Sequence, residues 1–304
     1  MRVFVAGGSG VLGRRLVPQL VARGHQVTAT TTSRAKLGLL DQLGAEGLVM
    51  DGLDAAAVGE AVAASKPDVV VNQMTALSEA HSGKPNLRKP DLFFAGTNRL
   101  RSEGNDHLMA AAQASGASHF IAQGHASMNG VRTGGWVKTE EDPLEVLEGT
   151  KAVNQMEAAV VAAGGAVLRY GGFYGPGATD DQVELVRKRM FPLIGSGSGW
   201  FSWVHLDDAA SATVLAVEQQ VKGVFNIVDD EPAPVSTWLP YLAECVGAKP
   251  PRRIPRWVAR LLAGEMAVGM VTEGRAFSNA KARRELGWEL RFPSWRQGFK
   301  EGLA

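Results

Sequence analysis

Three glycines near the start of the chain, Gly7, Gly10 and Gly13, recur at every third position between a short apolar run and an apolar pattern with helical spacing. Glycine lets the backbone turn tightly and approach a phosphate, and the N-terminus of the following helix supplies partial positive charge. A glycine loop that joins a strand to a helix at the start of a βαβ series is typical of dinucleotide binding. We therefore expect this loop to hold a pyrophosphate, rather than to be a purely structural turn, through Gly7, Ser9, Gly10, Val11, Leu12 and Gly13.

The end of the second expected strand, residues 26–31, indicates which dinucleotide binds. It is followed by Thr32, Ser33 and Arg34 and carries no carboxylate. A carboxylate at this place holds the ribose hydroxyls of NAD, whereas hydroxyls and a guanidinium suit the 2′-phosphate of NADP. The sequence thus favours NADP over NAD, with a merely solvated Arg34 as the alternative. Asp51, after the third strand, could accept a hydrogen bond from the adenine amino group or cap the next helix.

Composition narrows the class of protein. The chain has 304 residues, 32 Lys and Arg against 31 Asp and Glu, and a hydrophobic fraction of 45%. A formal net charge of +1 gives no basic surface for nucleic acid, and the single cysteine, Cys245, permits neither an internal disulfide nor a zinc cluster. There is no signal-peptide pattern and no apolar run long enough to span a membrane. We expect a cytoplasmic protein, a monomer or homodimer, with a small-molecule substrate and no metal, membrane or nucleic-acid partner.

Strands and helices alternate along the first two thirds of the chain. This order predicts an α/β fold, a Rossmann-type doubly wound parallel sheet with helices on both faces. The expected strands are 3–6, 26–31, 47–50, 68–72, 120–122, 166–169 and 224–228, and the expected helices are 11–21, 37–43, 55–64, 97–115 and 153–163.

The pattern loosens after residue 173, where glycine and proline become frequent. We expect residues 1–172, with about 202–228, to form the NAD(P)-binding domain, and residues 173–201 and 229–304 to form a smaller substrate lobe. Most of the tryptophans lie in this part of the chain, and they either pack a core or line an apolar pocket. They are Trp200, Trp203, Trp238, Trp257, Trp288 and Trp295.

Several motifs together resemble the extended short-chain dehydrogenase/reductase superfamily, in its NAD-dependent epimerase/dehydratase-like branch. They are the loop from Gly7 to Gly13, Asp51, Asn98, the run Leu-Arg-Tyr-Gly-Gly-Phe-Tyr-Gly-Pro-Gly at 168–177 and Val-His-Leu-Asp-Asp-Ala at 204–209. The resemblance implies NAD(P) bound across the strand ends, with a C-terminal lobe that closes over a small substrate. It also implies further cofactor contacts from Gly52, Gln73, Met74, Asn98, Gln123, Gly172 and Phe173.

The chain departs from this family in the residues that move protons. The resemblance implies a tyrosine whose pKa is lowered by a lysine four residues later, with a serine or threonine that holds the substrate carbonyl. The chain has three tyrosines, and none of them is followed by lysine at that distance. If Glu157 matches the family glutamate, the tyrosine position is Gly149 and the lysine position is Val153. The sequence therefore predicts an atypical active site.

Other residues are candidates to replace the missing pair. The serine position of the family falls on His125, or on Gly124 in a shifted register, and imidazole titrates near neutral pH. His125 is thus a candidate proton donor or acceptor, although a histidine there is also often a packed side chain. Ser127 could hold a carbonyl or cap a loop. Lys151 flanks the tyrosine position but lies on a different helix face, where solvent exposure is the simpler expectation.

Two further groups carry residue types that could do chemistry. The segment that follows the fourth strand should border the nicotinamide, and it contains His81. His81 is therefore a second candidate for proton transfer, weaker than His125. His205 with Asp207 and Asp208 resembles a metal site, but acids before an alanine-rich helix are more simply a cap and partners of the helix dipole.

These features favour an NAD(P)-dependent oxidoreductase or epimerase-like enzyme that acts on a small carbonyl or alcohol without the usual tyrosine–lysine pair. Two other functions stay open. One is a non-redox protein that senses NADP(H) or binds a partner, and the other is a lyase or isomerase on the same fold.

Overall fold

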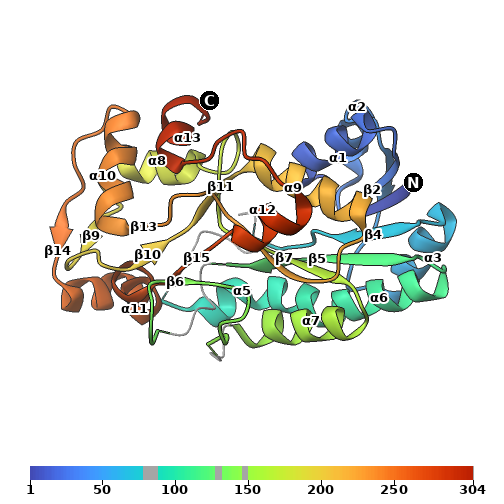
Figure 1. Ribbon diagram of the computed structural model, residues 1–304, viewed down its shortest axis with the longest axis horizontal. Coiled ribbons are helices and arrows are strands. Elements are labelled where there is room, and N and C mark those ends of the chain that lie inside the picture. Colours follow the sequence, from blue (N-terminus) through green and yellow to red (C-terminus); the bar gives the residue numbers. More distant parts are fainter. Residues whose placement is uncertain (78–87, 127–131, 146–149, 304) are drawn as a thin grey trace.

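The computed structural model describes residues 1–77, 88–126, 132–145 and 150–303. At its centre lies a parallel sheet of seven strands in the order β12-β7-β5-β4-β1-β2-β3 (Figure 1). The Rossmann-type α/β fold predicted from the sequence is confirmed. The strands are β1 (Arg2–Ala6), β2 (Gln26–Thr31), β3 (Glu46–Val49), β4 (Val69–Asn72), β5 (His119–His125), β7 (Ala166–Tyr170) and β12 (Gly223–Ile227).

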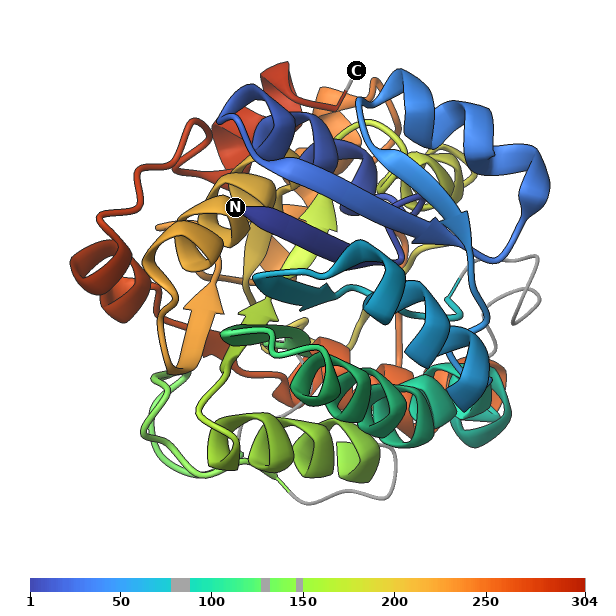
Figure 2. The same ribbon diagram turned by 90° about the vertical axis from the view of Figure 1, so that its right-hand side faces the viewer.

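Helices cover both faces of this sheet, which Figure 2 shows between two helical layers. One layer holds α1 (Gly13–Ala22), α2 (Leu37–Gln42), α9 (Leu206–Gln219) and α12 (Ala280–Leu286), and the other holds α3 (Ala55–Ser65), α6 (Asn105–Ala114) and α7 (Lys151–Ala162). Because both faces are covered, a central strand such as β4 is buried at all of its positions. This is why its residues are a continuous apolar run rather than an alternating pattern.

The long helix predicted over 97–115 is interrupted in the structure. Helix α5 (Pro90–Arg99) begins earlier and leads into a π-helical turn, η2 (Leu100–Gly104), which joins it to α6. Pro90 is the first residue of α5, a position that tolerates the missing N–H. A π-turn inserts extra backbone into a helix and is frequent at functional sites.

The C-terminal part forms a lobe of four helices and short strand pairs around a second core. Its helices are α8 (Asp180–Arg187), α10 (Val235–Cys245), α11 (Arg256–Glu273) and α13 (Trp295–Glu301). The pairs are β8 (Gly172–Tyr174) with β11 (Trp203–His205), β9 (Leu193–Ile194) with β14 (Arg253–Ile254), β10 (Trp200–Phe201) with β13 (Ala233–Pro234), and β6 (Val137–Lys138) with β15 (Ala276–Phe277).

Most of the lobe tryptophans belong to a core. Trp203, Trp238 and Trp295 are buried and pack edge-on against neighbouring aromatic rings, including Tyr174. Trp257 differs, because 64% of its surface is exposed. Core packing is thus the observed role of these three tryptophans, whereas Trp257 lies at the surface.

One segment assigned to the lobe from the sequence lies elsewhere. Helix α12 packs against α9 and β12, and its buried Ala282 and Leu286, with Trp288, belong to the core around the central sheet. This segment joins the central core because α12 has an apolar face that packs against it. From the sequence, the frequent glycines and prolines of the C-terminal third assign the whole segment to the lobe. The predicted boundary at 229–304 therefore needs this correction for residues 280–288.

No helix in the described ranges is both long enough and apolar enough to cross a membrane.

Candidate active site

The glycine loop lies where the sequence predicts it, between β1 and α1, and its geometry depends on missing side chains. Gly7 has a φ of +88°, and a Cβ there would lie 2.8 Å from the carbonyl oxygen of Gln73. A Cβ on Gly13 would lie 2.4 Å from the carbonyl oxygen of Gly8. No side chain caps α1, and its first turn carries no acid. The N–H groups of Arg14 and Arg15 donate to the carbonyl oxygens of Gly10 and Leu12, so the groups that suit an anion such as a pyrophosphate are those of Val11, Leu12 and Gly13 just before them.

Threonines at the end of β2 hold the loop in place. Thr30 Oγ1 accepts a hydrogen bond of 3.0 Å from the Gly7 N–H, and Thr31 Oγ1 accepts one of 3.0 Å from the Ser9 hydroxyl. Beyond them Thr32 and Arg34 are exposed, and Ser33 is half-buried. The side chains predicted to hold a 2′-phosphate are thus accessible, and their role stays a prediction.

Asp51 follows β3 and does not cap the next helix. Its Oδ1 accepts a hydrogen bond of 2.9 Å from the Leu53 N–H, which forms a local turn. The cap of α3 is Asp54, whose Oδ1 accepts hydrogen bonds from the N–H groups of Ala56 and Ala57. The adenine contact predicted for Asp51 remains a prediction.

The strand order reverses between β1 and β4, and ligands of doubly wound sheets bind at this point. Gln73 follows β4, donates from Nε2 to the Tyr170 hydroxyl at 3.2 Å, and leaves Oε1 buried with no partner in the described ranges. Asn98 Oδ1 is also buried and has no hydrogen-bond partner in the described ranges. Gly52 lies beside Met74, since a Cβ on it would be 2.5 Å from the Met74 sulfur. Unsatisfied acceptors beside a glycine cradle fit a polar ligand such as a dinucleotide.

His125 ends β5, opposite Tyr170 of β7, and is half-buried. Burial, and in second place the charge of Arg101, lowers the pKa of His125 to about 4. The imidazole is therefore neutral at pH 7, where it cannot act as a cationic proton donor. This environment weakens the role of general acid predicted for His125, while hydrogen bonding to a ligand stays open.

The structure places the remaining predicted residues as follows. Lys151 is the exposed first residue of α7, and Val153 is 2% exposed in the core. Ser127 and His81 lie outside the described residues. Gln123, Gly172 and Phe173 are half-buried at the ends of β5 and β8. Their roles in cofactor binding stay predictions.

A buried ion pair behind His125 was not predicted from the sequence. Arg169 of β7 donates to both carboxylate oxygens of Glu157 on α7, with the shortest contact 2.6 Å from Nη2 to Oε2, and each side chain is only 5% exposed. Burial raises the pKa of Glu157, and the neighbouring Arg169 and Arg101 oppose that rise. Gly124 makes room for this pair, because a Cβ there would lie 2.7 Å from Glu157 Oε1.

Arg101 of η2 completes this group and was also missed. The sequence held a signal for it, because Thr97, Arg101 and Asn105 recur every fourth residue and all three are buried. Polar side chains in such a row lie on one helix face. When such a helix face packs against the sheet, its polar side chains form a buried polar group inside the protein instead of a surface exposed to solvent.

Asp207 and Asp208 lie in the first turn of α9, as partners of the helix dipole, but the cap expected from these acids is supplied by His205. His205 Nδ1 accepts a hydrogen bond of 3.1 Å from the Asp207 N–H at the start of α9. Asp208 is buried and accepts from the N–H groups of Arg291 and Phe292 at 2.8 and 2.9 Å. Among the described residues, no three His, Cys, Asp or Glu side chains are grouped so that they could hold a metal ion.

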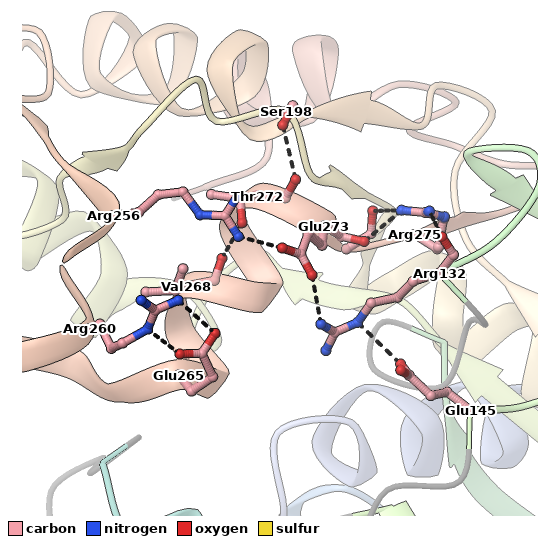
Figure 3. Close-up of polar contacts among 11 residues, drawn as sticks. Arg132, Glu145, Ser198, Arg256, Arg260, Glu265, Val268, Thr272, Glu273 and Arg275 are labelled. Carbon is pink, nitrogen blue, oxygen red and sulfur yellow. Dashed lines mark hydrogen bonds and ion pairs between the residues drawn. The ribbon is translucent and has the colours of Figure 1, made fainter.

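Ion pairs connect the loop that follows β5 to the lobe (Figure 3). Arg132 contacts Glu273 at the end of α11 at 2.8 Å and Glu145 at 3.3 Å. Glu273 also pairs with Arg256 at the start of α11, and Arg275 donates to the Arg132 carbonyl. The network brings the two ends of α11 together, which is possible because Gly264 breaks the helix with a φ of +88°.

Comparisons with known proteins agree with this architecture. Residues 3–228 match the model of the NAD dependent epimerase/dehydratase family. The chain is 40% identical to a 3-diazoavenalumate denitrifying reductase from a Streptomyces species, over 98% of this chain and 99% of the relative.

Solved structures share the fold at low identity. The UDP-glucose 4-epimerase of Thermotoga maritima, solved with UDP-glucose, superposes with a TM-score of 0.80 at 22% identity, over 100% of this chain and 97% of the other. The human epimerase family protein SDR39U1, solved with NADPH, gives 0.78 at 23% identity, over 100% and 99% of the two chains.

The first prediction concerns the cradle. Gly13→Ala should weaken NADPH binding by at least about tenfold, because the new methyl group meets the Gly8 backbone and moves the helix end away from the loop. Titration of the purified protein by calorimetry measures this. Gly59→Ala is the matched control, since nothing lies within 4 Å of a Cβ at Gly59 on α3. Equal affinity in both variants would show that the loop does not bind the dinucleotide.

The second prediction concerns pH. The pKa of His125 is about 4 in the folded protein and has an ordinary value of 6.5, so the folded state binds fewer protons between these values. His125 therefore lowers stability as the pH falls from about 6.5 to about 4 and has no such effect at pH 7. His125→Asn should reduce the loss of thermal stability between pH 7 and pH 4.5, measured by circular dichroism. An unchanged loss would contradict the assigned environment.

The third prediction concerns the link to the lobe. Glu273→Gln should cost at most about 1 kcal/mol of stability, because half-exposed ion pairs contribute little. It should nevertheless speed amide hydrogen exchange at residues 132–138, which lose their ionic contact with α11. Glu265→Gln is the control, since Glu265 pairs with Arg260 inside α11. The same exchange in both variants would rule out the link.

Proposed function

Because this chain belongs to the NAD-dependent epimerase/dehydratase family, we propose that it is an NADPH-dependent reductase. Its substrate accepts a hydride and gives a product that needs no proton from an enzyme side chain. The observation that carries the proposal is the pairing of an intact dinucleotide cradle with the missing tyrosine–lysine motif. The reductase with which this chain shares 40% identity supports the reductive direction.

The residues present fit a dinucleotide. The loop from Gly7 to Gly13 would hold the pyrophosphate, and Gln73 and Asn98 offer buried acceptors without partners in the described ranges. Thr32, Ser33 and Arg34 would favour the 2′-phosphate of NADP. A reduced nicotinamide supplies a hydride when bound.

Proton supply decides the class of substrate. A ketone that accepts a hydride becomes an alkoxide, which needs a proton at once. His125 is neutral, with a pKa of about 4, and burial raises the pKa of Tyr170 to about 12, where its hydroxyl is engaged with Thr213 and Gln73. Tyr174 is fully buried in the aromatic core, and burial raises its pKa. Among these side chains none is prepared to protonate an alkoxide.

A cationic electrophile removes this requirement. An arenediazonium ion takes a hydride at its terminal nitrogen and becomes a neutral aryldiazene. The aryldiazene loses N2 as its N–H hydrogen passes to the ring carbon, so the arenediazonium and hydride give the arene and N2, with both electrons from the dinucleotide. The name of the Streptomyces relative, a denitrifying reductase of a diazo compound, describes the same class of reaction. We infer that a diazo-substituted aromatic compound is the substrate class of this chain.

The fourth prediction tests this directly. Protein with NADPH and an arenediazonium salt should form NADP⁺, N2 and arene in equal amounts, faster than NADPH alone and faster than with the Gly13→Ala variant. Absorbance of NADPH and gas analysis measure the reaction. A panel of ketones under the same conditions should be reduced at least about a hundredfold more slowly.

Other outcomes would replace the proposal. Faster turnover of a ketone would restore the carbonyl substrate expected from the sequence. Tight NADPH binding without turnover of either class would favour a protein that senses NADP(H). Substrate conversion without net NADPH oxidation would favour a lyase or isomerase.

A further inference from the structure

Arg101 is a buried cation that has no ion-pair partner of its own in the described part of the chain. It lies in η2 between α5 and α6 and is 8% exposed. No hydrogen bond or ion pair connects its guanidinium to another residue in the ranges that the structure describes. Burial lowers the pKa of Arg101 to about 10, so it remains charged at pH 7. An uncompensated charge inside a protein destabilises the folded state.

Among the described residues, the carboxylate whose charge acts on Arg101 is that of Glu157, and it already has a partner. Glu157 lowers the cost of the Arg101 charge through space, but both of its oxygens accept hydrogen bonds from Arg169, at 2.6 to 3.2 Å. Two guanidiniums thus share one carboxylate, and the group holds one positive charge in excess. A purely structural arginine would have a partner of its own, as Arg169 has.

The position of this charge is close to the candidate active site. The charge of Arg101 reaches His125, which ends β5 at the edge where ligands of doubly wound sheets bind. The π-turn that carries Arg101 packs against α7. Its last residue, Gly104, lies close to Gly52, because a Cβ on Gly104 would be 3.2 Å from the Gly52 carbonyl oxygen. Helix α7 carries Val153, which is the lysine position of the family pattern if Glu157 matches the family glutamate. The chain therefore retains a cation beside this helix, but supplies it from a different element.

We propose that Arg101 binds an anionic oxygen of the substrate, in particular the carboxylate of an aromatic acid. The inference rests on the proposed function, because the substrate enters the same site. A guanidinium presents paired N–H donors that match the two oxygens of a carboxylate, and the incoming anion would neutralise the excess charge. Perturbed, uncompensated charges of this kind cluster at functional sites.

Binding without turnover tests the proposal independently of reductase activity. The probes are 4-hydroxycinnamate and its neutral amide, titrated calorimetrically into the protein saturated with NADP⁺. The wild type should prefer the carboxylate to the amide by at least about tenfold, as expected for a hydrogen-bonded ion pair. Arg101→Met should abolish the preference and Arg101→Lys should keep part of it, while NADP⁺ affinity changes less than about twofold in both.

Thermal unfolding of the ligand-free protein provides a second readout and shows whether the variants fold. Arg101→Met should raise the unfolding midpoint, because it removes an uncompensated buried charge; loss of a structural arginine would lower it. Arg99→Met is the matched control, since Arg99 is an exposed neighbour paired with Glu103 at 2.7 Å. It should leave the preference for the carboxylate unchanged.

Three results would overturn the proposal. The first is an unchanged carboxylate preference in Arg101→Met, and the second is no carboxylate binding to the wild type at about 10 mM. The third is a loss of NADP⁺ affinity in Arg101→Met with the preference intact, which would assign Arg101 to the cofactor. None of these bears on reduction of an arenediazonium ion, so failure of this inference is distinguishable from failure of the proposed function.

Discussion

The close approach of three backbone segments at the ends of β1 and β4 is the constraint on which the site depends. Gly7 can lie against the Gln73 carbonyl, and Gly13 against Gly8, only because neither glycine has a side chain. This contact lies at the start of α1, where no side chain caps the helix. Thr30 and Thr31 fix the loop from the side of β2. The shape of the loop predicted to bind the phosphates is therefore a consequence of packing between strand ends.

The features that could be predicted from the sequence are those with a local physical cause. Continuous apolar strands indicate a parallel sheet because both of its faces are covered, and glycine spacing indicates the loop because only glycine allows its backbone. The short strands of the lobe pair over long sequence distances, as Ala276 pairs with Val137, and nothing local announces them. Trp288 is also assigned wrongly from local sequence. It lies in the tryptophan-rich C-terminal part of the chain, but it packs in the core around the central sheet.

In the candidate site, too, residues with a local sequence pattern could be predicted, and residues brought together by tertiary contacts could not. Residues of the cradle follow from their spacing, whereas the buried group of Arg101, Glu157 and Arg169 joins η2, α7 and β7, which only the folded chain brings together. The environment of His125 was equally inaccessible to a pattern, because its pKa depends on burial and on the charge of Arg101. Residue type suggested a proton donor near neutral pH, and the surroundings make it a neutral imidazole.

The charge balance of this interior connects the lost motif to the chemistry that remains. A tyrosine–lysine pair would need a mobile proton and a nearby ammonium, but here Val153 is packed in the core, and the cation is the guanidinium of Arg101. A guanidinium does not release its proton near pH 7, so it can hold an anion but cannot serve as a general acid. A neutral imidazole and a permanent cation fit the proposal that Arg101 holds the carboxylate of a substrate whose diazonium group accepts the hydride. Neither group is prepared to protonate an alkoxide, and the proposal of a substrate that needs no such proton depends on this balance.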